Sequence, residues 1–308
     1  MPSIFKMLPL IIGQNIGKQV LERLAEPNRV TDKTDNVLQY DKVLETKLAI
    51  SYAIGIETIY RARPEPFGGR ALDICCGPGH MSITMARELK LESLIGVDLS
   101  APMVKVANAN AREQGMLKVS FREADATSLQ DFSDNEFDLT TMMDAAHHLS
   151  PPRAKEPLDP PTKWVSAALG EMDRVTSPGG LIVVMDLVRL RTKPMTEKYI
   201  ELLAHDYEKR GLPAFKEDFR DSMYAAWTTN ELRLAVPKQS KRQWNLVVPR
   251  GLPFAQFLMG FPRERRSPFI NRGRMWNDVN RVPVSAENMP DYRLARLMMA
   301  TAALNSID

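Results

Sequence analysis

The chain has 308 residues, which is enough for one large α/β domain or two smaller domains. Hydrophobic residues make up 44% of the chain and charged residues 26%, so the composition excludes a wholly disordered or fibrous protein. The formal net charge of +3 is too close to balance to indicate a nucleic-acid-binding protein.

The apolar run from Met7 to Ile12 near the N-terminus is shorter than a membrane-spanning helix, and no small-residue cleavage site follows it. We interpret this segment as an amphipathic helix of a folded protein rather than as a membrane-surface anchor. The chain is therefore expected to be soluble and cytoplasmic, with no stable membrane insertion.

A helical pattern follows, and strands and helices then alternate along the chain. The predicted elements are a helix at 42–60, a strand at 71–75, a helix at 80–89, a strand at 94–97, a helix at 101–114, strands at 119–123 and 138–143, a helix at 162–175 and a strand at 181–186. Alternation with apolar strands predicts an α/β fold, in which a doubly wound, mostly parallel sheet carries helices on both faces.

The alternation of strands and helices stops after the fifth strand. Residues 195–236 have a helical pattern, and strands return at 244–248 and 254–260, so we expect the sheet to be completed after a helical insertion. Residues 263–281 are rich in arginine, which we interpret as a solvated tail or subunit contact, and a last helix is predicted at 292–304. That helix is apolar enough to pack on its own domain or on a partner chain, so a homo-oligomer is one of two possibilities that the sequence leaves open.

These patterns divide the chain into four parts. The predicted parts are a helical N-terminal cap (1–66), a core (67–190 and 240–262), a helical lid (191–239) and an Arg-rich C-terminal extension with a terminal helix (263–308).

The two cysteines, Cys75 and Cys76, are adjacent, which excludes a disulfide framework and a C-x-x-C metal pair. Because the chain also has only four histidines, we expect no structural zinc site and assign no metal site. The cysteines are interpreted as small buried side chains rather than as a redox pair.

The most informative stretch is ALDICCGPGH at 71–80, where a hydrophobic strand runs into a glycine turn and then a helix. Gly77 and Gly79 allow the backbone to approach a ligand, and the helix N-terminus offers free N–H groups. The turn alone also fits a nicotinamide dinucleotide loop, with Ser82 as the small third residue.

Two carboxylates favour a different ligand. Asp73 lies in the strand before the glycines, where a negative charge suits a cation better than a pyrophosphate. Asp98 ends the second strand, where a carboxylate can bind both ribose hydroxyls. A turn without a ligand would leave Asp73 as a costly buried charge. A ligand with a ribose, a positive charge and no phosphate satisfies both acids, and S-adenosylmethionine (SAM) is such a ligand.

Five ordered motifs carry a family resemblance. They are Asp73 to Gly79, Gly96 to Ser100 with Met103, Ala124 to Ala126, Phe137 to Leu139 continuing to His147-His148-Leu149, and Leu169 to Val175 with Ser177 to Gly180. With these motifs the chain resembles the class I SAM-dependent methyltransferases, particularly the small-molecule group with a type 11/25 core. The resemblance implies a Rossmann-like sheet, SAM as cofactor and S-adenosylhomocysteine as product.

The resemblance also implies the residues of the cofactor site. In the family, the residue after the second acid packs on adenine and the acid of the third motif accepts from its amino group, which assigns Leu99 and Asp125 to those roles. Cys75 stands where the family more often has glycine. The implied cofactor-binding residues are Asp73, Cys75, Gly77, Gly79, Asp98, Leu99, Met103, Asp125, Ala126 and Met142.

Three side chains are candidates for catalysis. His147 and His148 follow the fourth strand, where a histidine could take a proton from an acceptor. The alternative, that this pair only lines the pocket or packs, stays open. Asp144 could pair with a substrate amine, and the cluster His205-Asp206-Tyr207 in the lid is a further candidate.

The sequence therefore predicts a methyltransferase that moves a methyl group by in-line displacement to O, N or C of a small molecule such as a natural product. Two alternatives stay open. One is an RNA- or protein-modifying methyltransferase that docks through the Arg-rich end, although no nucleic-acid partner is expected. The other is a relative that binds SAM without transferring methyl groups.

Overall fold

The computed structural model describes residues 4–26, 37–38, 41, 49–62, 68–149, 161–205, 207, 213–263, 284–286, 288–299 and 302–307. The first part of the helix predicted at 42–60, Asp206, and all of the Arg-rich segment except Arg263 lie outside these residues.

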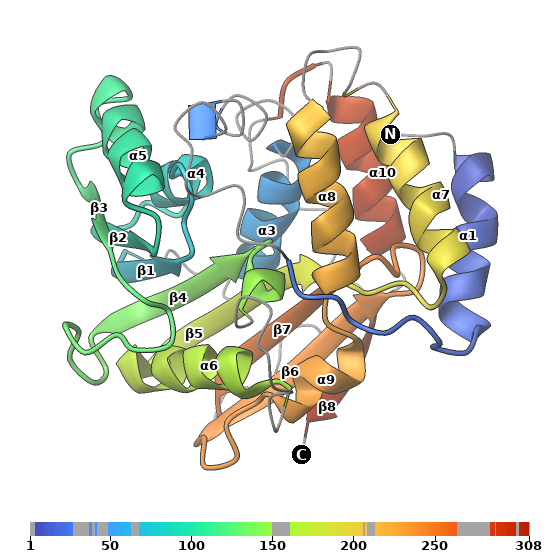
Figure 1. Cartoon of the computed structure of the whole chain (residues 1–308). Helices are drawn as coiled ribbons and strands as arrows, with labels where there is room; N and C mark the ends of the chain where they lie inside the picture. The colour runs from blue at the N-terminus through green and yellow to red at the C-terminus, as the bar shows by residue number, and fades with distance from the viewer. Residues whose placement is uncertain are drawn as a thin grey trace.

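A sheet of eight strands in the order β3-β2-β1-β4-β5-β7-β6-β8 forms the centre of the molecule (Figure 1). Its strands are β1 (Arg70–Ile74), β2 (Ser93–Asp98), β3 (Val119–Glu123), β4 (Phe137–Met143), β5 (Thr176–Leu187), β6 (Arg242–Pro249), β7 (Ala255–Pro262) and β8 (Ala302–Ile307). The first five are parallel, and β7, β6 and β8 are joined to them by antiparallel pairing. The strand order reverses between β1 and β4, and the carboxyl ends of strands at such a point form a ligand-binding crevice in open α/β sheets.

Helices cover both faces of this sheet. They are α1 (Ile4–Ile16), α3 (Ala49–Ala62), α4 (His80–Glu88), α5 (Ala101–Glu113), α6 (Lys163–Val175), α7 (Lys193–Ala204), α8 (Pro213–Ala225), α9 (Thr229–Leu234) and α10 (Met289–Met299), with the short 3₁₀ helix η1 (Ala146–His148). One core layer holds residues of α3, α4, α5 and α10, and a second holds residues of α6 and α9. The predicted doubly wound α/β sheet with a helical insertion after the fifth strand is confirmed.

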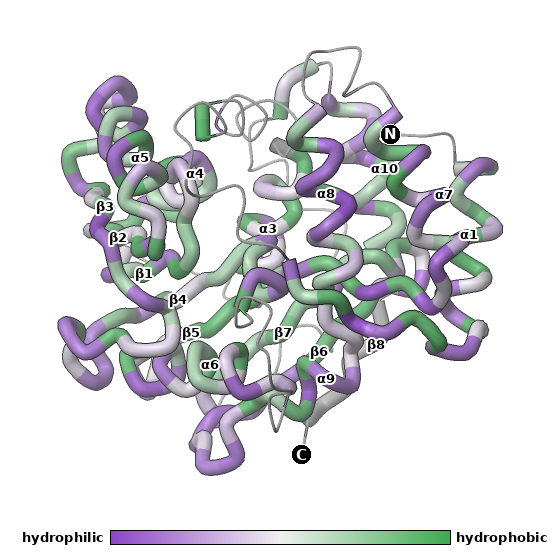
Figure 2. The backbone as a smooth tube through the Cα atoms, in the orientation of Figure 1, coloured by the Kyte–Doolittle hydropathy of each residue, from purple (hydrophilic) through white to green (hydrophobic). Residues whose placement is uncertain are grey.

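Successive side chains of a strand point to opposite faces of the sheet, so they pack alternately in the two core layers. In β5, Val183 and Met185 belong to the first layer and Ile182 and Val184 to the second, and all four are buried. Each such side chain stabilises the fold by roughly 1.5–3 kcal/mol. Burial on both faces explains why these strands have continuous hydrophobic sequences, and hydrophobic stretches of the chain run along β5 and β7 in Figure 2.

A third hydrophobic cluster lies beside the sheet, where α1 packs on α7 and α7 packs on α8. Met7 and Leu10 of α1 join Tyr199, Met223 and Phe254 in it, while Phe5 and Ile16 of α1 stay exposed. After α1 an extended segment, the N-terminal strap (residues 17–26), crosses the molecule (Figure 1). Its backbone is bound by hydrogen bonds from Val20 and Leu21 to the Arg191 carbonyl and from Leu24 to the Tyr224 carbonyl.

Two elements differ from the predictions. Strand β5 begins at Thr176 instead of 181, so residues 177–180 are part of the strand, with a register shift opposite Phe137 and Leu139. The last helix ends at Met299, and residues 302–307 form β8, where the helix was predicted to continue to 304. Pairing with β6 from Trp244↔Ile307 to Pro249↔Ala302 outweighs the local helical pattern.

Among the described residues, no helix combines the length and the apolar character that crossing a membrane requires.

Candidate functional site

The glycine loop between β1 and α4 has a left-handed backbone at three positions: Cys75 (φ 55°), Gly77 (φ 54°) and Gly79 (φ 83°). A Cβ at position 79 would lie 2.6 Å from the ring of Phe121, so Gly79 is required by packing inside the protein. No atom lies within 4 Å of a Cβ built at Gly77, so the loop is open on that side. The predicted close approach of a ligand therefore concerns Gly77, while Gly79 packs against Phe121 and starts α4.

Asp73 lies near the carboxyl end of β1 and is almost fully buried. It accepts hydrogen bonds from the Ser82 hydroxyl of α4 (2.5 Å) and the Thr141 hydroxyl of β4 (2.7 Å). Burial raises the pKa of this carboxyl to about 6, although both hydroxyls act in the opposite direction. A cation beside Asp73 would restore the charge that burial disfavours.

Asp98 ends the neighbouring strand β2. One of its oxygens accepts from the backbone N–H of Gly77 and the other from that of Ser100, both at 2.9 Å. Burial raises the pKa of this carboxyl despite these bonds. A carboxylate oxygen has two lone pairs, so each oxygen can still accept one ligand hydroxyl. Asp98 thus fixes the glycine loop and keeps the capacity to bind a diol.

The other predicted cofactor residues take different positions. Leu99 is 69% exposed, and a ring stacked on its side chain would remove this apolar surface from water. Asp125 is also exposed, and one of its oxygens accepts hydrogen bonds from the backbone N–H and the hydroxyl of Thr127. Met103 and Ala126 are buried. Met142 is fully buried in the second core layer, and its contact with a cofactor stays a prediction.

This arrangement fits SAM better than a phosphate-containing dinucleotide. The loop and the first turns of α4, residues 71–86, contain no lysine or arginine to balance a phosphate, and the carboxyls of Asp73 and Asp98 lie on adjacent strands. Gly77, where the loop is open, lies between Asp73 and Asp98 in the sequence. Two carboxyls with a free helix N-terminus suit a cationic amino-acid end and a ribose.

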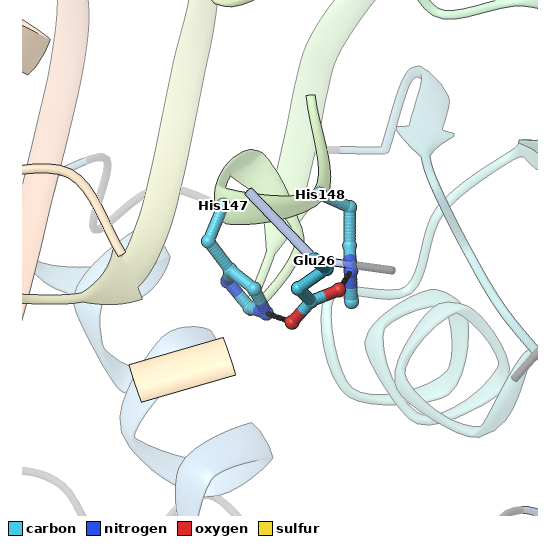
Figure 3. Close-up of side chains that lie close together, drawn as sticks. All are labelled: Glu26, His147 and His148. Atoms are coloured by element: carbon cyan, nitrogen blue, oxygen red, sulfur yellow. Dashed lines mark hydrogen bonds and ion pairs between the residues drawn. The ribbon is translucent and has the colours of Figure 1, made fainter. Parts of the chain in front are cut away.

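The two histidines lie on η1, directly after β4. His147 is 3% exposed; its Nδ1 is 2.5 Å from Asp186 Oδ1, and its Nε2 is 3.8 Å from Glu26 Oε1. His148 is more exposed, and its Nδ1 is hydrogen-bonded to Glu26 Oε2. Figure 3 shows the Glu26 carboxylate between the two rings. The N-terminal strap therefore places the Glu26 carboxylate beside the two histidines, whereas the sequence analysis considered only residues that follow the fourth strand.

Charges within this group are strongly coupled. Burial would raise the pKa of Glu26, but His148, His147 and the Ser222 hydroxyl lower it to about 2. Burial would lower the pKa of His148, but Glu26, Asp218 and Asp186 raise it to about 9. His148 is therefore an imidazolium at neutral pH in the chain on its own.

Asp144 follows β4 with a left-handed backbone (φ 50°) and is half-buried. Its carboxylate accepts a hydrogen bond from the Ser51 hydroxyl of α3 at 2.6 Å. Burial raises the pKa of this carboxyl to about 6, with the Asp186 charge acting in the same direction. Asp144 is thus a carboxyl that exchanges a proton near neutral pH.

Comparisons with known proteins agree with this geometry. Residues 71–180 match the family model described as a methyltransferase domain. The chain is 30% identical over 178 residues to demethylmenaquinone methyltransferase of Bacteroides fragilis, an alignment that covers 56% of this chain and 65% of that relative. It is 29% identical over 179 residues to the uncharacterized methyltransferase YcgJ of Bacillus subtilis, covering 58% of this chain and 61% of the relative. Over residues 71–180 the chain is thus similar to the methyltransferase domain family.

Solved structures agree with this chain in fold. A putative S-adenosyl-L-methionine-dependent methyltransferase from Methanococcus maripaludis has a TM-score of 0.54 at 17% identity, and the match covers 79% of this chain and 99% of that chain. A SAM-dependent methyltransferase from Aquifex aeolicus has a TM-score of 0.50 at 14% identity, covering 74% of this chain and 97% of that chain. This chain spans less than two thirds of the length of the curated relatives named above.

Sequence reasoning missed five polar residues of the candidate site: Glu26, Ser51, Ser82 as a partner of Asp73, Thr141 and Asp186. Asp186 was detectable, because it lies at the carboxyl end of β5, one residue before its last, beside the strand that precedes His147. The carboxyl ends of parallel strands meet at one edge of a sheet. Glu26 gives no such signal, since it lies in an unpatterned segment 122 residues from His148.

The candidate His205 lies elsewhere. It lines a cavity of about 640 Å³ between α7 and α8, together with Glu197, Lys198, Lys216 and Arg220 among others. No residue of the glycine loop or of η1 lines this cavity, so the structure does not bring His205 to the candidate site.

Both cysteines are free, Cys76 is buried and Cys75 half-buried. Burial raises the pKa of both thiols well above the usual range, as do the nearby charges of Asp98 and Asp73. The thiols are therefore protonated at neutral pH, which agrees with their interpretation as packing residues.

Proposed function

We propose that this protein transfers the methyl group of SAM to a small, mainly apolar acceptor that carries an ionisable hydroxyl group. The observation that carries the proposal is the pair of buried carboxyls, Asp73 and Asp98, on adjacent strand ends beside an open glycine loop at the point where the strand order reverses.

Each residue of the cofactor site has a distinct task. SAM supplies a methyl group that its sulfonium charge already activates. Asp98 binds the ribose hydroxyls, and Asp73 provides the negative charge for the cationic amino-acid end. Leu99 and Asp125, both exposed at the carboxyl ends of β2 and β3, are available to the adenine ring and its amino group. These residues hold the ligand in one orientation, which supplies a large part of the rate of a displacement reaction.

The acceptor site lies where Asp144, α3 and α7 meet. Asp144 is bonded to Ser51 of α3, and its charge raises the pKa values of Tyr52 of α3 and Tyr199 of α7, after the effect of their burial. Tyr199 also joins the apolar cluster of α1, α7 and α8. The acceptor class is further supported by relatives whose names specify demethylmenaquinone, because its reduced form is a hydroquinone.

Asp144, rather than His148, is the proton acceptor in this proposal. A carboxyl with a pKa of about 6 is mostly ionised at neutral pH and can take a hydroxyl proton, whereas His148 is already protonated. His147 is held between Asp186 and Glu26, so its nitrogens face carboxylates of the protein.

The test is methyl transfer from isotopically labelled SAM to a panel containing a short-chain demethylmenaquinol, simple phenols and amines. We expect transfer to a hydroxylated ring, and Asp144→Asn should lower kcat about 100-fold with unchanged SAM affinity. The exposed Asp131→Asn is the matched control. Transfer to amines alone would contradict the acceptor class, and full turnover by Asp144→Asn would contradict its role as base.

A further inference from the structure

Three potential metal ligands come together at the end of β4. Glu26 of the N-terminal strap and the adjacent His147 and His148 of η1 each offer one ligand atom, and these atoms all lie within 4.8 Å of one another. In Figure 3 the three side chains converge from two segments that are more than a hundred residues apart in the sequence.

Hydrogen bonding explains only part of this arrangement. One oxygen of Glu26 is bonded to His148, but Oε1 is buried and has no hydrogen-bond partner among the described residues. Oε1 faces Nε2 of His147 at 3.8 Å, which is too long for a hydrogen bond. In the neutral tautomer of His147 whose Nδ1 donates to Asp186, Nε2 carries a lone pair that is available to a metal ion.

We propose that Glu26, His147 and His148 bind a divalent transition-metal ion of the kind that prefers imidazole and carboxylate ligands, such as Zn²⁺. Bond lengths of about 2.0–2.2 Å at tetrahedral angles separate two ligand atoms by roughly 3.4 Å. The separation of 3.8 Å between Nε2 and Oε1 is a few tenths of an ångström above this value, and the ligand atoms of the three residues all lie within 4.8 Å of one another. The ion takes the place of the proton between His148 and Glu26.

The surroundings of the three ligands support this assignment. Asp186 accepts from Nδ1 of His147, and a carboxylate on the second nitrogen of a metal-binding histidine orients its ring and increases its basicity.

Access and coordination number define what the ion could do. His148 is 38% exposed at its side chain, so an ion can reach the cluster from solvent. Three protein ligands leave one tetrahedral position for water or for an oxygen of another molecule, as in catalytic rather than structural zinc sites. This inference does not depend on methyl transfer, because it concerns binding of the ion alone.

The experiment is calorimetric titration of chelator-treated protein with ZnCl₂, followed by the visible absorption spectrum with Co²⁺. We expect one site in the wild-type protein. Glu26→Gln and His148→Ala should each weaken Zn²⁺ binding at least tenfold, and Asp186→Asn should weaken it by 10- to 100-fold, roughly the effect typical of outer-shell partners. His205→Ala removes an exposed histidine outside the cluster and is the matched control.

Thermal unfolding and SAM binding of each variant show that it is folded, since the cofactor residues lie outside the cluster. The half-exposed His148 provides a second variant if Glu26→Gln does not fold. Absence of Zn²⁺ binding in the wild-type protein would overturn the proposal. So would equal binding by the wild-type, Glu26→Gln and His148→Ala proteins, because an adventitious surface site would not depend on these residues.

Discussion

Asp73 is a carboxyl group whose burial raises its pKa from 3.8 to about 6. The folded chain therefore binds this proton more tightly than the unfolded chain. The stability that this proton contributes is fully present below about pH 4 and is lost as the pH rises through about 6. The ionised carboxylate that suits a cationic ligand is thus the form that the empty fold disfavours.

Cofactor binding should depend on pH for the same reason. With a pKa of about 6, roughly one tenth of Asp73 is ionised at pH 5, so SAM should bind about tenfold more weakly at pH 5 than at pH 7. The raised pKa of Asp98 acts in the same direction. Calorimetric titration at both pH values measures this, and Asp73→Asn should bind more weakly with a flatter pH dependence. Equal affinity of the wild-type protein at both values would contradict the role of Asp73.

Cys75 adopts a left-handed backbone conformation (φ 55°) that glycine accepts without cost. The family more often has glycine there, so Cys75→Gly should relieve strain and raise the free energy of unfolding by about 1 kcal/mol. Its thiol packs only at the edge of the second core layer, so little packing is lost. Urea unfolding of this variant beside Cys76→Ala, a buried neighbour with negative φ, distinguishes the two effects. Destabilisation by Cys75→Gly would show that packing of the thiol outweighs the strain.

At the scale of elements, the N-terminal strap depends on Arg23. Its guanidinium donates to the carbonyls of Ala225 (2.6 Å) and His147 (2.9 Å) and lies 3.6 Å from the ring centroid of Trp227. Charge-assisted bonds of this kind contribute more than neutral ones, so Arg23→Ala should lower the free energy of unfolding by about 2 kcal/mol. Lys18→Ala, an exposed cation of the same strap, should have little effect. Equal unfolding midpoints of the two variants would contradict this anchoring.

The strap also shows where sequence patterns stop being informative. Strands β1 to β5 and their helices could be predicted because strand burial and helix periodicity are local signals. The strap has no regular structure, and its position is set by hydrogen bonds to Arg191 and Tyr224, which are far away in the sequence. Strand β8 was missed for a related reason, because its conformation depends on the edge of β6.

At the scale of the whole molecule, the fold and the proximity of Asp73, Gly77 and Asp98 were predictable from the sequence, and the surroundings of His147 and Asp144 were only partly so. Asp73, Gly77 and Asp98 lie together because parallel strands end at one edge of the sheet, so their order in the sequence fixes their meeting point. The surroundings of His147 and Asp144 combine side chains from the strap, α3 and β5. Such contacts between distant segments leave no spacing pattern in the sequence.

The most direct test of the cofactor site is calorimetric titration of the protein with SAM, S-adenosylhomocysteine and NAD, using wild-type chain and Asp98→Asn. Asn keeps one acceptor oxygen for the loop amides but loses the charge and the second acceptor. We predict that the wild-type protein binds SAM and S-adenosylhomocysteine but not NAD, and that Asp98→Asn binds both about 100-fold more weakly. Glu92→Gln, an exposed acid at the opposite end of the same strand, should bind like the wild type. Binding of NAD in place of SAM, or unchanged affinity in Asp98→Asn, would contradict the placement of the cofactor.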